Sequence, residues 1–522
     1  MTQSDLHRPI THSELIVNSL RRWPHREAFR QDDLSWTYRE TEARLARFVP
    51  VLQSKGLGRG QGVGVLSPNR PEVWLSQAGA GIAGGRYTAL HPLGSFSDHE
   101  YACNEAELRI LLVDPKFAER AGALLEACPA VETVLTFGPA DVGEDVNALV
   151  EKIGAARLDG GPNGPEDISW LLYTGGTTGV PKAAQLPEAA VAQMAFSVSN
   201  GWDLPKQRRY LACAPITHAA GMLITPTLMA GGTIVLQNGF DPERWLSDVV
   251  SEQATLALLV PTMIYAVLDH PKLESADFSR LETIMYGASP MSPSRLVEGI
   301  ERIGPVFAQL YGQTECGGVA TSLWREHHDV SRMERLSSCG ITMPGARVEV
   351  LDEAGQPVPD GEAGEICVQG PSVMRGYFKQ PELTAETIVD GWLRTGDMAV
   401  RDEEGFFTIV DRKKDMIVSG GFNVFPREIE DVLSAHPSVS AAAVIGVPDE
   451  KWGEAVKAIV VARPGEAIDA DALIGLVKEQ KGPVYAPKSI DVVDALPLTA
   501  VGKPDKKVLR AEYWGESKRG VN

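Results

Sequence analysis

The chain has 522 residues, of which 43% are hydrophobic and 23% are charged. This composition is typical of a globular protein and argues against a disordered chain or a membrane protein. Asp and Glu exceed Lys and Arg by 69 to 50, a net charge of −19, which argues against a general nucleic-acid binder because phosphates attract clustered cations. No signal peptide is visible and the six cysteines lie far apart, so we expect a cytoplasmic protein with reduced thiols.

Short apolar runs alternate with amphipathic stretches between residues 63 and 311. This alternation is typical of βαβ units and predicts a layered α/β architecture. The expected strands are 63–66, 110–113, 168–173, 233–236, 256–260 and 306–311. The clearest expected helices are 72–82, 242–250 and 293–303.

The pattern changes after residue 338. Alternating runs at 346–351, 365–369 and 406–410, separated by Gly-rich turns, predict a small antiparallel, barrel-like β unit over 338–410. Beyond the charge cluster at 411–415, a compact α+β module is expected. Its strands are 416–418, 441–447, 455–461 and 490–493, and its helices begin at Pro426 and cover 470–480 and 506–513.

These three sequence patterns predict an α/β protein with a large N-terminal domain, residues 1–411, and a smaller C-terminal domain, residues 412–522. The smaller domain contains 16 basic and 16 acidic residues, so the negative charge belongs to the larger one. We expect the basic residues of the smaller domain, among them Lys506, Lys507 and Arg510, to face an interface with anionic ligands.

The most unusual local sequence is YTGGTTGVPK, residues 173–182, directly after an expected strand. Its glycines let the backbone approach an anion, its Thr hydroxyls can donate hydrogen bonds, and Lys182 supplies a positive charge. The segment therefore predicts a phosphate loop. It differs from the loop of P-loop NTPases, because Lys182 follows Pro181 and precedes Ala183.

Three further segments carry polar groups suited to a nucleotide. YGQTE, residues 311–315, ends a strand, where Thr314 can bond a phosphate and Glu315 can help to hold Mg²⁺. Thr395-Gly396-Asp397 offers an acceptor for ribose hydroxyls, and Lys503 follows Gly502 in a loop near the C-terminus. Each segment is weak evidence alone.

Together with RTGD and DRKKDMIVSGGFNVFPREIE, these segments resemble the adenylate-forming superfamily, and the resemblance covers residues 34–507. This superfamily includes acyl-CoA synthetases, the adenylation domains of nonribosomal peptide synthetases and beetle luciferases. The resemblance implies an acyl-CoA synthetase-like fold with a mobile C-terminal domain. It also implies an enzyme that joins a carboxylate to AMP from ATP with Mg²⁺, then passes the acyl group to CoA.

The resemblance also implies roles for individual residues. The residues expected to bind ATP or AMP are Thr174, Gly175, Gly176, Thr177, Thr178, Gly179, Lys182, Gly287, Ala288, Ser289, Tyr311, Gly312, Gln313, Thr314, Asp397, Arg412 and Lys503. The residues expected to act in catalysis are Lys503, Lys182, Thr314 and Glu315, with Thr177 and Glu315 near the metal. The hinge between the two half-reactions is expected at Lys414, and the CoA passage at Ser419, Gly420 and Gly421.

The acyl pocket is expected at His218, Met222, Gly312, Gly317, Gly318 and Val319. Residues 214–221 contain no carboxylate to hold an α-ammonium group, so the resemblance favours an apolar acid, whether fatty, aromatic or alicyclic. Pro187 and Glu188 replace a Thr-His pair that is frequent in relatives, with no effect predicted.

Three alternatives stay open. The acceptor is a carrier protein instead of CoA, the enzyme carries out luciferase-type chemistry, or the chain is a non-catalytic nucleotide- and acyl-binding protein. The expected partners are a small carboxylic acid, ATP and CoA, with no nucleic acid and no transmembrane segment. A homodimer also stays open.

Overall fold

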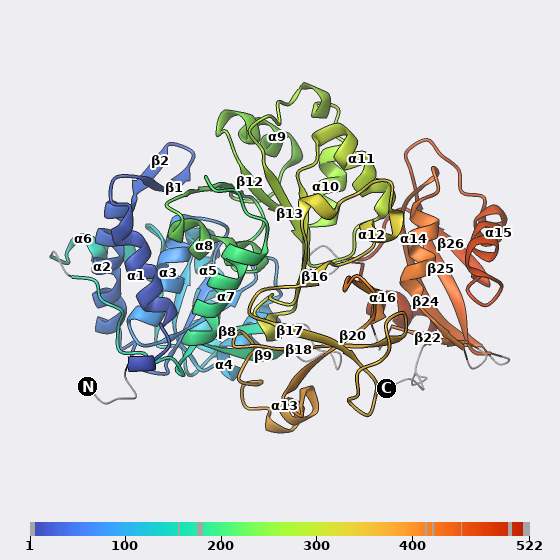
Figure 1. Ribbon diagram of the computed structural model, residues 1–522. Helices are drawn as coiled ribbons and strands as arrows, with labels where there is room; N and C mark the ends of the chain where they lie inside the picture. The colour runs from blue at the N-terminus through green and yellow to red at the C-terminus, as the bar shows by residue number, and fades with distance from the viewer. Residues whose placement is uncertain are drawn as a thin grey trace.

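The computed structural model describes residues 6–154, 157–174, 181–412, 415–419, 422–449, 452–498 and 504–514. These residues form four β-sheets with their covering helices. Figure 1 shows the N-terminal elements in blue and green and the C-terminal module in orange and red on the far side of the molecule. The predicted α/β class, with a large N-terminal domain and a smaller C-terminal one, is confirmed.

The first sheet has seven strands in the order β7-β6-β5-β3-β4-β8-β9. Its strands are β3 (Gly62–Leu66), β4 (Arg86–Leu90), β5 (Leu108–Val113), β6 (Thr133–Thr136), β7 (Glu144–Asp145), β8 (Ile168–Thr174) and β9 (Lys182–Pro187). Its crossover helices are α3 (Pro71–Ile82), α4 (Phe96–Glu105), α5 (Ala118–Ala127) and α6 (Val146–Glu151). All neighbouring strands are parallel except β8 and β9, which form an antiparallel hairpin.

The second sheet has nine strands in the order β16-β15-β14-β13-β12-β10-β11-β1-β2. Its strands are β1 (Glu27–Gln31), β2 (Leu34–Thr37), β10 (Arg209–Ala212), β11 (Thr233–Leu236), β12 (Leu256–Leu259), β13 (Thr283–Gly287), β14 (Phe307–Tyr311), β15 (Thr321–Leu323) and β16 (Ile341–Thr342). The six strands from β1 to β14 in this order are parallel, whereas β2, β15 and β16 are antiparallel to their neighbours.

The remaining helices of the N-terminal part include the predicted ones at 242–250 and 293–303. They are α1 (His12–Arg22), α2 (Tyr38–Ser54), α7 (Glu188–Gly201), α8 (Ile224–Met229), α9 (Pro242–Ser251), α10 (Pro261–Leu268), α11 (Pro293–Ile303) and α12 (Met333–Leu336). Short 3-10 helices occur at η2 (Pro115–Phe117), η3 (Ala219–Leu223), η4 (Leu273–Ser275), η5 (Thr314–Cys316) and η6 (Arg325–His327).

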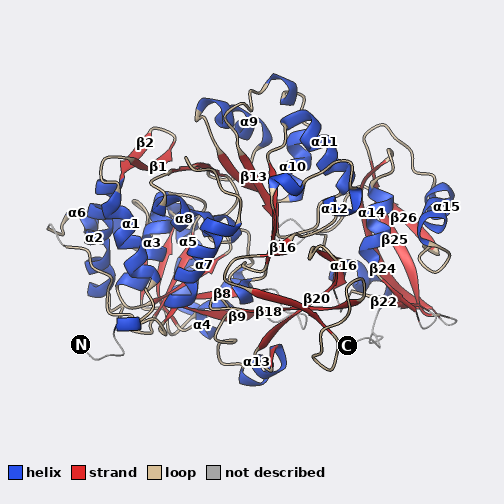
Figure 2. Cartoon of the chain, viewed as in Figure 1, coloured by secondary structure: helices blue, strands red, loops and turns tan. Residues whose placement is uncertain are grey.

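Helices α1, α2, α3 and α7 lie side by side next to the first two sheets (Figure 2). Local sequence fixes where the first two begin, because Thr11 with Glu14 and Thr37 with Glu40 form complete capping boxes. The side chain of Glu188 is fully buried at the start of α7 and accepts hydrogen bonds from the backbone nitrogen of Ser13, at 2.9 Å, and from its hydroxyl, at 3.2 Å. The Pro-Glu pair that departs from relatives thus joins α7 to α1.

The third sheet is antiparallel, in the order β17-β18-β20-β19, and β21 pairs with residues 397–401 of β20. Its elements are β17 (Arg347–Leu351), β18 (Ala363–Gln369), α13 (Pro381–Thr387), β19 (Ile388–Val389), β20 (Trp392–Arg401) and β21 (Phe407–Arg412). Residues 339 and 340 pair with Phe407 of β21, close to where the unit is expected to begin, whereas residues 341–342 pair with β15 in the second sheet. One expectation is corrected, because the described pairings form an open sheet instead of a barrel.

The C-terminal module contains a five-stranded sheet in the order β23-β22-β25-β24 with β26 on β25. Its elements are β22 (Ile417–Ser419), β23 (Phe422–Val424), α14 (Pro426–Ser434), β24 (Val439–Asp449), β25 (Gly453–Ala462), α15 (Ala470–Lys481), β26 (Ser489–Val493) and α16 (Lys506–Trp514). As the sequence indicates, α14 buries Ile429, Val432 and Leu433. The predicted domain boundary, between residues 411 and 412, falls at the last residue of β21.

None of the helices in the described part of the chain combines the length and the apolar character that crossing a bilayer requires.

Candidate functional site

The predicted phosphate loop closes the β8–β9 hairpin. Thr174, the last residue of β8, pairs with Lys182, the first residue of β9. The intervening residues Gly175, Gly176, Thr177, Thr178 and Gly179 lie outside the described residues. The strand pairing holds the two ends of the loop opposite each other, so Lys182 occupies a fixed position on a strand.

Glu315 lies at the centre of a polar cluster beside this hairpin. Its carboxylate is only 7% exposed and accepts hydrogen bonds from the hydroxyl of Tyr377, at 2.8 Å, and from that of Thr174, at 3.3 Å. The ammonium of Lys182 donates to the Tyr377 hydroxyl at 2.5 Å and lies 3.8 Å from the Glu315 carboxylate. The cluster thus joins the first sheet to the turn after β14.

Sequence reasoning missed Tyr377. A β-bridge between Ala184 and Tyr377 brings this tyrosine beside β9, where its ring also lies 4.2 Å from the Lys182 ammonium. Burial and the Glu315 carboxylate raise the pKa of Tyr377, so its hydroxyl remains a hydrogen-bond donor. The signal for this residue is tertiary, because residues 374–378 contain no pattern that marks a site.

A second carboxylate, Asp397, lies on β20 and is 5% exposed. Its Oδ2 accepts 2.8 Å hydrogen bonds from the Tyr311 hydroxyl and from the Gln313 amide. Burial has the largest effect on the Tyr311 hydroxyl and the negative charge of Asp397 the next largest. Together they raise the pKa of Tyr311 well above its usual value. Arg412 stands opposite Asp397 in the β20–β21 register.

The turn after β14 therefore links the two carboxylates. Tyr311 and Gln313 contact Asp397, and Glu315 follows two residues later with the Lys182 cluster. Thr314 is the first residue of η5 in the same turn. Residues that the sequence analysis grouped by motif alone are brought together at this point.

The segment Gly287-Ala288-Ser289 begins at the last residue of β13, which pairs with β14. A Cβ on Gly287 would lie 2.4 Å from the carbonyl oxygen of Leu310, so only glycine fits there. Ala288 adopts a left-handed conformation, with φ of 62°, which costs a non-glycine residue on the order of 1 kcal/mol. Such local strain is concentrated at functional sites, which makes this turn a candidate ligand contact.

The glycines of the expected acyl pocket lie so close to neighbouring atoms that a larger side chain would not fit. A Cβ on Gly312 would lie 2.4 Å from the carbonyl carbon of Gly318, and one on Gly318 would lie 2.3 Å from the Cε of Met222. Gly317, like Gly318, has a left-handed backbone. Val319 is fully buried in the main hydrophobic core, so the structure places it behind this wall instead of on its surface.

His218 has an exposed edge, and its ring packs edge-on against His91, with ring centroids 4.9 Å apart. Its Nδ1 lies 2.9 Å from the Thr217 hydroxyl. Surrounding protein atoms remove solvation from the ring and, with His91, lower the pKa of His218 to about 4. His218 is therefore a neutral side chain at neutral pH.

Several predicted residues of the C-terminal half lie outside the described residues: Lys414, Gly420, Gly421 and Lys503. Ser419 is buried at the end of β22, opposite Phe422. A β-bridge between Leu498 and Pro504 joins the two ends of the segment that contains Lys503.

The expectation that Lys506 and Arg510 face anionic ligands is wrong for this structure. Lys506 forms a 2.8 Å ion pair with Glu430, and Arg510 forms one of the same length with Asp415. Glu430, Asp411 and Asp415 outweigh burial and raise the pKa of Lys506. Both cations thus stabilise contacts of the C-terminal module.

The described residues contain no group of three or more His, Cys, Asp or Glu side chains arranged for a metal ion. Mg²⁺ in nucleotide sites is usually held by one or two carboxylates together with substrate phosphates. A single buried carboxylate beside a threonine hydroxyl, as at Glu315 and Thr174, has the hard oxygen atoms that this ion prefers. The donor set therefore fits Mg²⁺.

Two family models match the chain. The model for AMP-binding enzymes covers residues 16–378, and that for the C-terminal domain of AMP-binding enzymes covers residues 428–503. The chain belongs to the AMP-binding enzyme family. Predicted membership of the adenylate-forming superfamily, and of its acyl-CoA synthetase branch, is confirmed.

The relatives extend over nearly the whole chain. A medium/long-chain-fatty-acid–CoA ligase of Mycobacterium tuberculosis is 45% identical, with 99% of this chain and 92% of the relative covered. A feruloyl-CoA synthase of an Amycolatopsis species is 37% identical, with 95% and 98% covered. Among solved structures, an amide bond synthetase of Marinactinospora thermotolerans matches with a TM-score of 0.89 at 32% identity, covering 96% of this chain and 100% of that one.

Proposed function

We propose that this AMP-binding enzyme is an ATP-dependent acyl-CoA ligase for an apolar carboxylic acid. The acid attacks the α-phosphorus of ATP, which gives an acyl-AMP and pyrophosphate. The sulfur of CoA then attacks the acyl carbon, which gives the thioester and AMP. The observation that carries this proposal is the turn after β14, where residues 311–315 connect the buried Asp397 to the Lys182–Tyr377–Glu315 cluster.

The cluster suits the phosphate end of ATP. Lys182 supplies a positive charge from a fixed strand position, and the loop of residues 174–179 would supply backbone and hydroxyl donors. Glu315 and Thr177 would hold Mg²⁺, which neutralises phosphate charge when it is bound. Tyr377 orients Lys182 and Glu315 relative to each other, so it is a positioning residue in this proposal.

Asp397 suits the ribose. A carboxylate can accept about four hydrogen bonds, and Tyr311 and Gln313 orient this one through its Oδ2. Arg412 stands across the strand pair and would assist it. The strained turn at 287–289, together with Tyr311, Gly312 and Thr314, would border the adenine and the phosphates.

The residues of the expected acyl pocket favour an acid that carries no charge other than its carboxylate. His218 is neutral, residues 214–221 contain no carboxylate, and Met222 faces Gly318. A bound ammonium group would lack a counter-charge there, at a cost of several kcal/mol. Similarity to ligases named for fatty acids and for ferulate supports the same class.

Catalysis of the first step is a matter of positioning and charge, because both reactants are anions. Lys503 would bridge the substrate carboxylate and the α-phosphate in this step. In the second step, rotation of residues 412–522 about Lys414 would withdraw Lys503 and bring Ser419, Gly420 and Gly421 to the CoA passage. In the sequence, Lys414 falls between the end of β21 and the start of β22.

The test measures exchange of labelled pyrophosphate into ATP with Mg²⁺ and a panel of medium-chain, long-chain and hydroxycinnamic acids, followed by mass spectrometry of products with CoA. Acid-dependent exchange and a CoA thioester are expected. If pyrophosphate exchange occurs but a thioester forms only on an added carrier protein, the acyl acceptor is that carrier protein instead of CoA. Folded protein that binds ATP but exchanges with no acid would overturn the proposal in favour of a non-catalytic binder.

A further inference from the structure

A cavity of about 420 Å³ lies at the edge of the second sheet where β10, β11 and β12 begin. The candidate nucleotide site lies at the opposite edge, because Gly287 and Tyr311 end the parallel strands β13 and β14. These strands are four or five residues long, which separates the two edges by about 13 Å or more at roughly 3.3 Å per residue. The cavity is therefore distinct from the proposed active site.

The lining of this cavity is strongly basic. Five of its twelve lining residues are cations and none is an acid, although the chain as a whole has a net charge of −19. The cations are Arg26, Lys206, Arg208, Arg209 and Arg280. Such a concentration of one sign in an acidic protein makes the cavity a local attractor for anions.

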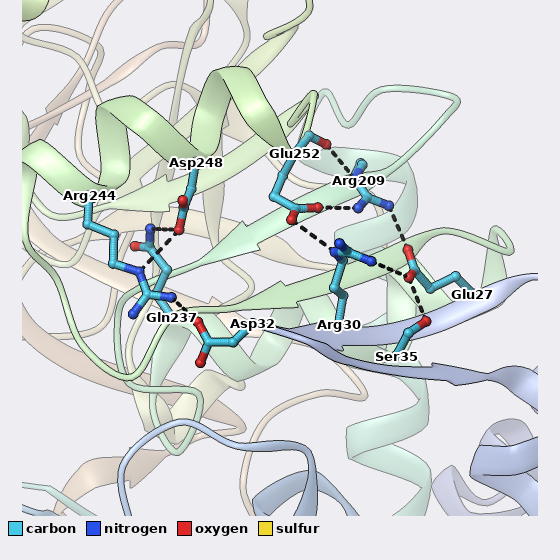
Figure 3. A network of polar contacts seen from close by, with 9 residues as sticks. All are labelled: Glu27, Arg30, Asp32, Ser35, Arg209, Gln237, Arg244, Asp248 and Glu252. Carbon is cyan, nitrogen blue, oxygen red and sulfur yellow. Dashed lines mark hydrogen bonds and ion pairs between the residues drawn. The ribbon is translucent and has the colours of Figure 1, made fainter.

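The charge of Arg209 is balanced by carboxylates that contact it, as drawn in Figure 3. It forms ion pairs with Glu252 and, at 2.8 Å, with Glu27. Arg30 contacts the same two carboxylates, at 2.9 Å and 3.4 Å respectively. Two guanidinium groups thus balance two carboxylates, and this network has no negative charge left for the other cations of the cavity.

The other four cations form no ion pair within the described part of the chain. Arg208 is half-buried, and its guanidinium donates to neutral acceptors, among them the Pro226 carbonyl at 2.6 Å and the Ser199 hydroxyl at 3.2 Å. Burial alone lowers the pKa of Arg208. A half-buried cation without a counter-charge is costly, and a bound anion would remove that cost.

The remaining three cations line the same cavity. Arg26 lies 4.1 Å from the ring centroid of Trp23 and donates to the Gly231 carbonyl at 3.3 Å, so its position is fixed. Lys206 and Arg280 are exposed. Arg side chains present a fork that matches two oxygens of a phosphate, and Lys adds a point charge.

We propose that this cavity binds a small phosphorylated ligand with at least two negative charges. Its volume lies within the range of roughly 300–1,000 Å³ that is usual for small-molecule pockets. The four cations without a counter-charge carry more positive charge than a single carboxylate could neutralise. A diphosphate, or a phosphate diester that carries a second anionic group, matches this charge better. The shared chemistry is the phosphate group, which either a soluble metabolite or a lipid headgroup can provide.

The test compares wild-type protein with the double variant Lys206→Gln/Arg280→Gln. Both residues are exposed, so the substitutions should leave folding intact. The control variant is Lys152→Gln/Lys478→Gln, which makes the same charge change at exposed positions outside the cavity. The probes are inorganic pyrophosphate and, separately, phosphatidylcholine vesicles that contain phosphatidylglycerol. Hydrogen exchange of peptides covering 205–212 and 228–236 reports on the cavity, and peptides covering 306–316 report on the nucleotide site.

Protection of residues 205–212 and 228–236 is expected in wild type and in the control, with an apparent Kd about 10-fold or more weaker in the double variant. Protection by pyrophosphate identifies a soluble ligand, and protection by vesicles alone identifies a lipid headgroup. Equal protection in wild type and the double variant, or no protection by either probe, would overturn the proposal. Protection at 306–316 is independent of this result, because it reports on the proposed active site.

Discussion

The phenolic hydroxyl of Tyr377 donates a 2.8 Å hydrogen bond to the carboxylate of Glu315, which lies 62 residues earlier in the chain. The same hydroxyl accepts a hydrogen bond from Lys182. One side chain thus holds the cation and the anion of the proposed phosphate site at a fixed separation.

Tyr377→Phe should lower the kcat/KM of adenylation for ATP by about 10-fold, the scale of one hydrogen bond to a charged group. The ring remains, so the packing beside Ala184 is kept. The measurement is pyrophosphate exchange at varied ATP concentration. Tyr485→Phe, a half-buried tyrosine of the C-terminal module, is the matched control. A Tyr377→Phe enzyme as active as this control would show that Tyr377 has no positioning role.

Asp397→Asn should raise the KM for ATP by about 10-fold or more, because ribose hydroxyls would lose a charged acceptor while the shape of the side chain is retained. Asp390→Asn is the control, since Asp390 is exposed and its positive φ suits asparagine. Initial rates against ATP concentration give the result. An effect on the KM for the acid with an unchanged KM for ATP would contradict the ribose assignment.

Lys503→Ala should reduce adenylation by at least about 10²-fold, which is the effect of removing one donor to transition-state charge. The variant should still convert a supplied acyl-AMP and CoA into the thioester, because rotation withdraws Lys503 before that step. The two half-reactions are assayed separately, with the exposed Lys507→Ala as control. Equal loss in both half-reactions would exclude the proposed role.

Met222→Ala should shift the preference of the enzyme toward bulkier acids, because Met222 occupies the space beside Gly318. The KM for ATP should change less than about 2-fold, since no nucleotide contact is removed. Competition between short and long acids measures the shift by mass spectrometry of the products. Met229→Ala, at a half-buried methionine that ends α8 and packs in a different hydrophobic cluster, provides the comparison. Unchanged selectivity would place the acyl pocket elsewhere.

Glu188→Gln should change how stability depends on pH. Burial raises the pKa of Glu188 above its value in the unfolded chain, so the folded state holds this proton more tightly. The stability that Glu188 contributes is therefore present below the unfolded pKa and is lost as the pH rises through the folded pKa. Thermal unfolding from pH 4 to 8 should show wild type losing stability relative to the variant as pH increases. A constant difference would mean that Glu188 has an ordinary pKa in the folded protein.

Much of the fold could be predicted because its signals are local. The apolar runs at 110–113 and 233–236 and the amphipathic stretch at 293–303 coincide with β5, β11 and α11. Two missed strands are β10, which has only four residues and therefore too short a pattern, and β20, whose side chains mix buried positions with the residues of a motif. The RTGD motif lies within β20, and its Gly396 has a positive φ, so a turn signal there marks an irregularity in a strand.

The candidate site was predictable to the extent that motifs carry it. Lys182, Glu315 and Asp397 were each marked by local sequence, but their partners depend on tertiary contacts. Tyr377 reaches Glu315 because the segment between β18 and α13 pairs with β9, and Lys506 is neutralised by Glu430 from a different helix. Composition and spacing contain no information about such pairings.

The β8–β9 hairpin holds Lys182 in the first sheet, whereas Tyr377 arrives from a segment 195 residues further along the chain. Closing a loop of that length costs entropy, and the packing of the sheets on both sides offsets that cost. The phosphate cluster therefore depends on contacts between segments that are far apart in the chain. A chain that ends before residue 377 would lack the hydroxyl that joins Lys182 to Glu315, so the cation and the anion of the proposed phosphate site would lose their shared partner.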